Sequence, residues 1–190
     1  MTRWKKIALL LLLGTSLAGC KGVDTDAEKA RVEAAEKAAM VVEEKALAEY
    51  LASSKPVSLK LHELGETLER VWADCQEDCD IVAHKKAFED QVLPAFRSFL
   101  TALESMPTGS ERLALVHEPI VRAYRESGEL LGKYPDGLTE ENTAPRRIAY
   151  LNELDLRIKV VEKEYDVALS AYCKSVPNVS CDVSLAADTP

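Results

Sequence analysis

The 190-residue sequence lacks both the patterns that mark β-strands and the motifs that mark common catalytic sites. No long stretch alternates β-branched and polar residues, and no Asn-Gly or Asp-Gly turn joins two such stretches, which argues against hairpins and sheets. Gly-x-Ser-x-Gly, His-Glu-x-x-His and a phosphate-binding loop are also missing. The sequence therefore predicts an all-α protein that is not an enzyme.

Cofactor and nucleic-acid signatures are missing too. No Glu stands three residues before a histidine, as in di-iron bundles, and there is no Cys-x-x-Cys-His for covalent haem. Lys or Arg clusters with interleaved aromatics are absent, and the net charge is −8. An acidic chain is not attracted to nucleic acid over long distances, so we expect no nucleic-acid partner and no cofactor.

The N-terminus has a basic segment, a short apolar run and then small residues. The apolar run over residues 7–13 is too short to span a bilayer and is typical of a secretory signal. Leu-Ala-Gly-Cys at residues 17–20 resembles the lipobox of bacterial lipoproteins. This resemblance, which covers only the first 20 residues, implies that residues 1–19 are a signal peptide. It also implies that Cys20 carries a diacylglyceryl group and an N-acyl chain such as palmitate.

The implied lipid anchor predicts a location in the bacterial envelope. Lys21 follows Cys20; in enterobacterial lipoproteins Asp at this position retains the protein in the inner membrane. We therefore expect the outer membrane, facing the periplasm, with the inner membrane and the cell surface as alternatives. Removal of residues 1–19, which hold three basic and no acidic residues, changes the net charge from −8 to −11. Membrane contact is thus expected through the lipid, not through basic side chains.

Four further cysteines would meet the oxidising compartment of an exported protein, where an even number favours disulfides. In an up-and-down bundle, Cys75 and Cys79 lie at the opposite pole from Cys173, and Cα atoms more than about 7 Å apart are not bridged. We expect the pairs Cys75–Cys79 and Cys173–Cys181. A zinc site and a redox role are the alternatives, but neither pair has the two-residue spacing of zinc knuckles or thioredoxin-type motifs.

Apolar residues at three- and four-residue steps predict helices along most of the remaining chain. A tether over residues 20–26 precedes an Ala-rich helix over 27–54, which either packs as one more helix or forms a stalk or coiled-coil seam. Ser54-Lys55-Pro56 is expected to end this helix. The final residues, 182–190, are expected to be a disordered tail.

Residues 55–181 are expected to form the bundle itself, with Ser110 capping one helix and Pro94 and Pro119 kinking two of them. The expected helices cover residues 58–74, 81–106, 110–131 and 145–176. The predicted fold is an antiparallel bundle of four helices plus the long Ala-rich N-terminal helix.

His117 is the candidate ligand-binding residue, because it lies on the apolar stripe of its helix. Such a histidine is either a core residue with hydrogen-bonded ring nitrogens, a ligand of haem or a metal together with Met106 or an acidic side chain, or part of an interface. His62 lies off its stripe and His84 lies beside two lysines, so we expect both to be exposed.

Asp155 and Glu162 lie two helical turns apart at the edge of the last apolar stripe. Paired carboxylates can perform acid–base chemistry, but two turns separate these two by about 10 Å. We expect both to form salt bridges with Arg or Lys of a neighbouring helix.

The resulting hypothesis is a lipid-anchored, non-catalytic module that binds another envelope protein or supports an envelope assembly. A toxin-neutralising or exclusion lipoprotein is one variant. The alternative is a helical bundle that carries haem, a metal or a small molecule at His117.

Overall fold

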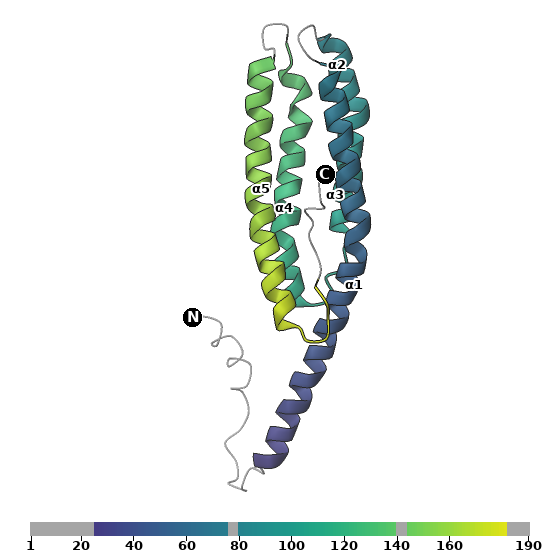
Figure 1. The fold of residues 1–190 in the computed structure, drawn as a ribbon. Helices are drawn as coiled ribbons and strands as arrows, with labels where there is room; N and C mark the ends of the chain where they lie inside the picture. Colours follow the sequence, from purple (N-terminus) through teal and green to yellow (C-terminus); the bar gives the residue numbers. More distant parts are fainter. Residues whose placement is uncertain (1–24, 76–79, 140–143, 182–190) are drawn as a thin grey trace, which may run out of the picture. The chain divides into compact units, whose positions relative to one another are not determined.

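The structure, a computed structural model, describes residues 25–75, 80–139 and 144–181 (side chains from 26–75, 80–139 and 150–181), and most of these residues are helical. Four helical stretches follow one another along the chain (Figure 1). They comprise α1 (Thr25–Ala73), α2 (Ile81–Ala87) continued by the π-helix η2 (Phe88–Val92) and α3 (Leu93–Glu104), α4 (Glu111–Lys133) with the short 3₁₀-helix η3 (Pro135–Gly137), and α5 (Ala144–Ser175). The predicted all-α fold is confirmed.

Helix α1 runs without a break through Pro56, so the predicted helix end at residues 54–56 is wrong. Pro56 has no N–H for the carbonyl of Ala52, but both residues are exposed, and water can solvate that carbonyl. The Ser53 and Ser54 hydroxyls donate to the carbonyls three residues earlier, at 2.7 Å each. The predicted Ala-rich helix and the first bundle helix are therefore one element.

The chain divides into two compact units between residues 37 and 38. In the first unit, residues 25–37 are helical, and the side chains from Asp26 on are exposed. The second unit contains the rest of α1 and all later helices.

The segment from α2 to α3 starts at Asp80, whose carboxylate accepts from the backbone N–H groups of Val82 and Ala83 at 2.9 and 3.1 Å. The π-helical turn of η2 ends two residues before Pro94. Proline displaces the carbonyl four residues before it, and a wider turn accommodates that displacement. This π-helical turn lies next to the site at which the sequence predicted a kink, Pro94.

Ser110 caps α4 as predicted, since its hydroxyl accepts from the Leu113 N–H at 3.1 Å. Gly109, just before it, has a φ of +54°. A Cβ at Gly109 would lie 2.8 Å from the Cβ of Ala46. The turn from α3 to α4 therefore needs glycine both for its backbone angle and for its close approach to α1.

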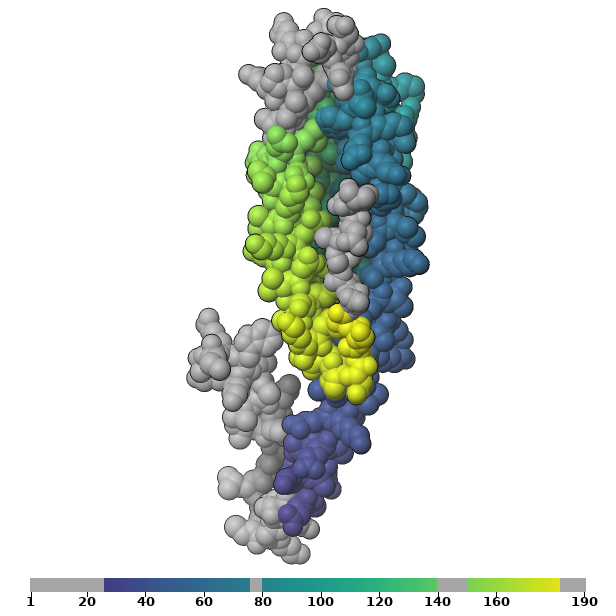
Figure 2. All heavy atoms as spheres, viewed as in Figure 1, coloured from purple at the N-terminus to yellow at the C-terminus, as the bar shows by residue number. Residues whose placement is uncertain are grey.

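The second unit is an antiparallel bundle of helices (Figure 1), drawn with all heavy atoms in Figure 2. One apolar core runs between its helices. Every helical stretch contributes to the core, and its largest fully buried side chains are Tyr50, Phe88, Phe99, Leu47, Leu103, Leu113 and Ile120. Among the described residues, no helix combines the length and the apolar character needed to cross a bilayer.

The predicted disulfide between Cys173 and Cys181 is present, with the two Cα atoms 5.9 Å apart. It fastens the end of α5 to the segment that follows. Cys75 takes part in a disulfide, whereas its predicted partner Cys79 lies outside the described residues. The predicted signal peptide, the lipidation site Cys20 and the tail over 182–190 also lie outside them.

Candidate functional site

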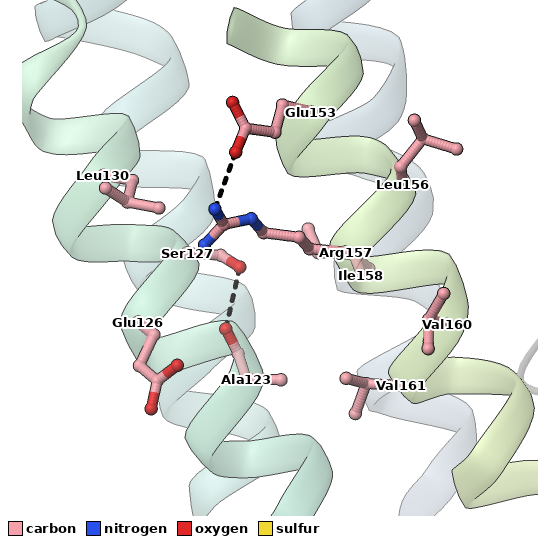
Figure 3. A pocket seen from close by; sticks show the side chains of 10 residues that line it. All are labelled: Ala123, Glu126, Ser127, Leu130, Glu153, Leu156, Arg157, Ile158, Val160 and Val161. Carbon is pink, nitrogen blue, oxygen red and sulfur yellow. Dashed lines mark hydrogen bonds and ion pairs between the residues drawn. The ribbon is translucent and has the colours of Figure 1, made fainter.

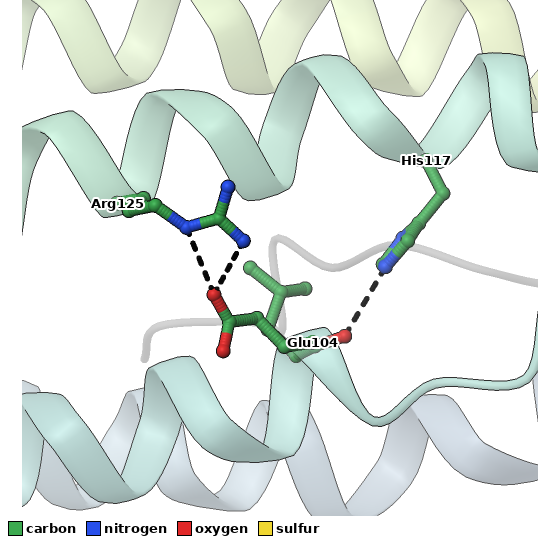
Figure 4. A network of polar contacts seen from close by, with 4 residues as sticks. Glu104, His117 and Arg125 are labelled. Atoms are coloured by element: carbon green, nitrogen blue, oxygen red, sulfur yellow. Dashed lines mark hydrogen bonds and ion pairs between the residues drawn. The ribbon is translucent and has the colours of Figure 1, made fainter.

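A chain of buried polar groups joins four helices in the core of the bundle, near the turn from α3 to α4. The Tyr50 hydroxyl of α1 lies 2.8 Å from His117 Nδ1 of α4 and 2.6 Å from the Tyr165 hydroxyl of α5. His117 Nε2 lies 3.1 Å from the carbonyl oxygen of Leu103 in α3 (Figure 4). All three side chains are at most 6% exposed.

The Leu103 carbonyl fixes the direction of every bond in this chain. A carbonyl only accepts, so His117 Nε2 must donate and Nδ1 must accept from Tyr50. Tyr50 then accepts from Tyr165. Burial lowers the pKa of His117 and raises the pKa of Tyr50 to about 12, so all members are neutral at pH 7. Burial also raises the pKa of Tyr165.

His117 is thus a core histidine whose two ring nitrogens are both hydrogen-bonded, one of the readings that its sequence position allowed. A metal or haem iron at His117 would have to replace either the Tyr50 or the Leu103 bond. No group of three or more potential metal-ligating side chains is found in the described part of the chain. Figure 4 also shows Arg125 of α4 binding Glu104 of α3, with nitrogen–oxygen distances of 2.7 and 3.1 Å. The surroundings of His117 are therefore those of a helix contact.

Asp155 and Glu162 do not form an acid–base pair, and the salt bridges predicted for them with neighbouring helices are wrong. Asp155 binds Lys159 of its own helix at 2.6 Å. Glu162 accepts a hydrogen bond from the Tyr124 hydroxyl of α4. Burial and the Glu162 charge raise the pKa of Tyr124 well above its usual range. One carboxylate is a surface ion pair, and the other joins α4 to α5.

A second polar cluster lies where α1, α4 and the end of α5 meet. The Glu43 carboxylate accepts from the Tyr172 hydroxyl and from the Ser110 hydroxyl, the latter at 2.8 Å. Arg112 lies over the Tyr172 ring, 5.2 Å from its centroid, and donates to Ser175 at 2.8 Å. Because each group has a partner within the bundle, this cluster fastens three helices.

His84 was expected to be exposed, but it is buried, with 5% of its surface accessible. Its ring packs edge-on against Trp72 of α1, 5.7 Å between centroids, and its Nε2 lies 3.3 Å from the Tyr134 hydroxyl. Phe88 completes this aromatic cluster, 4.5 Å from the Tyr134 ring. His62 is exposed, as expected, and lies 3.4 Å from Glu66.

An open groove of about 530 Å³ runs between α4 and α5 (Figure 3). Its floor and walls are mainly apolar, and Glu126, Glu153 and Arg157 stand among them. Arg157 binds Glu153 at 2.6 Å, and Ser127 donates to the carbonyl of Ala123 at 2.7 Å (Figure 3). Two of the lining residues, Leu156 and Val160, also belong to a larger exposed surface.

That surface, which we call the α5 face, consists of Leu156, Val160, Lys163 and Val167. The three apolar side chains are 64%, 58% and 65% exposed, and Lys163 is exposed as well. At 100° per residue, all four lie within about 60° of one another on the helix. Their steps of four, three and four residues could have been read from the sequence. The inward stripe of the same helix, which includes Leu154, Tyr165 and Leu169, lies on the opposite side.

Comparison of the chain with models of protein families, with curated proteins and with solved structures gives no match.

Proposed function

We propose that this protein is a lipid-anchored, non-catalytic interaction module of the bacterial envelope, held at the periplasmic side of the outer membrane through Cys20. The lipobox-like residues 17–20 support the anchor. A toxin-neutralising or exclusion lipoprotein is a variant of this function.

The α5 face carries the proposal that the module binds another protein. Single exposed apolar residues are common on protein surfaces, but an apolar stripe with heptad spacing beside a groove is typical of a helix that packs against another helix. The hydrogen-bonded state of His117 also favours a binding module over the haem, metal or small-molecule carrier.

The anchor is tested by metabolic labelling with a palmitate analogue and by separation of the two membranes. We expect the wild-type chain to be labelled and to fractionate with the outer membrane. Cys20→Ser should be unlabelled and leave the membrane fraction. An unlabelled wild-type chain, or a Cys20→Ser chain that still takes up label, would contradict the proposed anchor.

The interaction is tested with a genetically encoded photo-crosslinking amino acid in the full chain in cells. Placed at Val160, it should give a defined crosslinked species; placed at Leu115 of α4, which is 62% exposed, it should not. Leu115 is the matched control, because it is an equally exposed apolar residue that is not part of the α5 face. Absence of a crosslink at Val160, or equal crosslinking at both positions, would contradict the proposed docking face.

A further inference from the structure

Charged residues flank the α5 face in a regular order. Arg157 and Glu164 lie on one flank, and Lys159 and Asp166 lie on the other, given 100° per residue. Arg157 and Lys159 are 66% and 65% exposed, and each binds only a carboxylate four residues earlier on the same helix. Each flank thus carries a cation and, seven residues later, an anion, while the earlier carboxylates of Glu153 and Asp155 are paired with Arg157 and Lys159 within the helix.

In an antiparallel helix pair, each flank of one helix faces the same flank of the other. Two antiparallel copies of the α5 face can pack together in several registers. Neighbouring registers differ by a shift of seven residues of one helix along the other. With Leu156 opposite Val160, Arg157 faces Arg157 and Lys159 faces Lys159 of the other copy. Two pairs of like charges would oppose that register.

A second unfavourable register lies two seven-residue shifts away from the first. With Lys163 opposite Val167, Glu164 faces Glu164 and Asp166 faces Asp166, so like charges again meet on both flanks. Because the chain is already negatively charged, these carboxylate pairs would add to the repulsion between the two copies.

The intermediate register places Leu156 opposite Val167 and Val160 opposite Lys163. The flanks then pair opposite charges only. Arg157 faces Glu164 on one side and Lys159 faces Asp166 on the other, and two-fold symmetry repeats each pair. The order of charges along α5 therefore selects one register and disfavours its neighbours.

A parallel arrangement is less favourable. It would place Lys163 against Lys163 within the apolar seam, whereas the antiparallel register places Lys163 against Val160. The parallel arrangement would also leave Arg157 and Asp166 without opposite charges, since they would face Asn152 and Ala171.

We propose that the occupant of the α5 face is the same face of a second copy of this chain, packed antiparallel with Leu156 opposite Val167, Arg157 opposite Glu164 and Lys159 opposite Asp166. This inference rests on the proposed function, for which it names the first partner. The two-fold arrangement closes the interface, because both copies bury the same residues.

A charge-exchange experiment on the full lipidated chain tests the register. Two differently tagged copies are expressed together, extracted in detergent, and co-isolated through one tag. Arg157→Glu alone, and Glu164→Arg alone, should each reduce co-isolation at least tenfold, because each creates two like-charge pairs. When an Arg157→Glu copy is expressed with a Glu164→Arg copy, co-isolation should return to within about twofold of wild type.

The matched control is Arg122→Glu on α4. It removes a comparable exposed pair, Arg122 with Glu118 at 3.5 Å, but it is outside the α5 face and should leave co-isolation unchanged. Thermal unfolding followed by circular dichroism should show that all variants retain their helices, since every substituted side chain is on the surface.

Three results would overturn the inference: wild-type copies that do not co-isolate, an Arg157→Glu chain that still self-associates, or mixed variants that fail to recover. A parallel pair gives the second result, since Arg157 has no charged partner there. If the photo-crosslinker at Val160 captures only a different protein, the proposed docking face stands and self-association is wrong. If the photo-crosslinker captures nothing, both the proposed docking face and the proposed self-association are wrong.

Discussion

The hydroxyl of Tyr50 donates a hydrogen bond to Nδ1 of His117 across 2.8 Å, and the ring of one packs edge-on against the ring of the other. The two residues lie 67 positions apart in the sequence. Tyr50 is therefore both the donor that fixes the His117 ring and the acceptor for Tyr165, which makes it the central member of the buried chain.

This position predicts unequal costs for two chemically identical substitutions. Tyr50→Phe leaves His117 Nδ1 without a donor and Tyr165 without an acceptor, so we expect the free energy of unfolding to fall by about 2–4 kcal/mol. Tyr165→Phe removes a terminal donor and should cost about 1 kcal/mol. Urea unfolding of both variants measures the difference; equal costs would contradict the assigned bond directions.

Acidification should weaken the fold through His117. Because burial lowers its pKa in the folded state from 6.5, the unfolded chain takes up a proton first. The contribution of His117 to stability is therefore complete above pH 6.5 and is lost as the pH falls towards the folded-state pKa. His117→Gln should show a smaller loss of stability than wild type over this range. An unchanged pH dependence in His117→Gln would refute the assignment.

Alkaline solution should act through Tyr50. Its pKa is raised from 10.0 to about 12, with burial as the main cause. The unfolded chain then loses its proton first, so the contribution of Tyr50 is complete below pH 10 and is lost between pH 10 and 12. Stability measured across this interval should fall less steeply in Tyr50→Phe than in wild type. A steeper fall in the variant would show that Tyr50 does not titrate in this way.

Periodicity and capping rules predicted the later helices well because these features are local. Ser110 follows the preference of helix starts for a capping hydroxyl, and the apolar stripes of α3, α4 and α5 follow from residue spacing alone. The expected exposure of His84 is wrong because its neighbours, Trp72 of α1 and Tyr134 at the end of α4, come from elsewhere in the chain, and nothing in its own helix indicates them. The helix end expected at Pro56 is wrong for a similar reason: packing of buried residues on both sides, such as Tyr50 and Val57, outweighs the local cost of proline.

The spacing of apolar residues predicts that His117 lies on an apolar face, but it does not predict its partners, Tyr50 and the Leu103 carbonyl. The Tyr50 contact depends on the register between α1 and α4, which no pattern within either helix determines. The α5 face is the reverse case. Its heptad spacing and its charge order are local, so this candidate site could have been found before the fold was known.

Two glycines in helices should respond in opposite ways to replacement by alanine. A Cβ at Gly128 would lie 2.6 Å from Cε1 of Phe96, a core ring that is 6% exposed. We expect Gly128→Ala to destabilise the fold by about 1–2 kcal/mol, because the strain exceeds the gain in helix propensity. Gly65→Ala, with no atom within 4 Å of the new Cβ, should stabilise it by up to about 1 kcal/mol. Equal shifts in chemical denaturation midpoints would show that α3 and α4 are not so closely packed.

Pro56 is the clearest site at which the fold should gain stability. It lies inside α1, is exposed, and leaves the carbonyl of Ala52 to water. Pro56→Ala restores the missing N–H and removes the clash of the ring with that carbonyl, so we expect a gain of about 1–3 kcal/mol in the free energy of unfolding. Lys55→Ala, at the neighbouring exposed position, should change it by no more than about 0.5 kcal/mol. A loss of stability in Pro56→Ala would mean that the bundle depends on a bend at this residue, because only a helix shaped around proline would resist straightening.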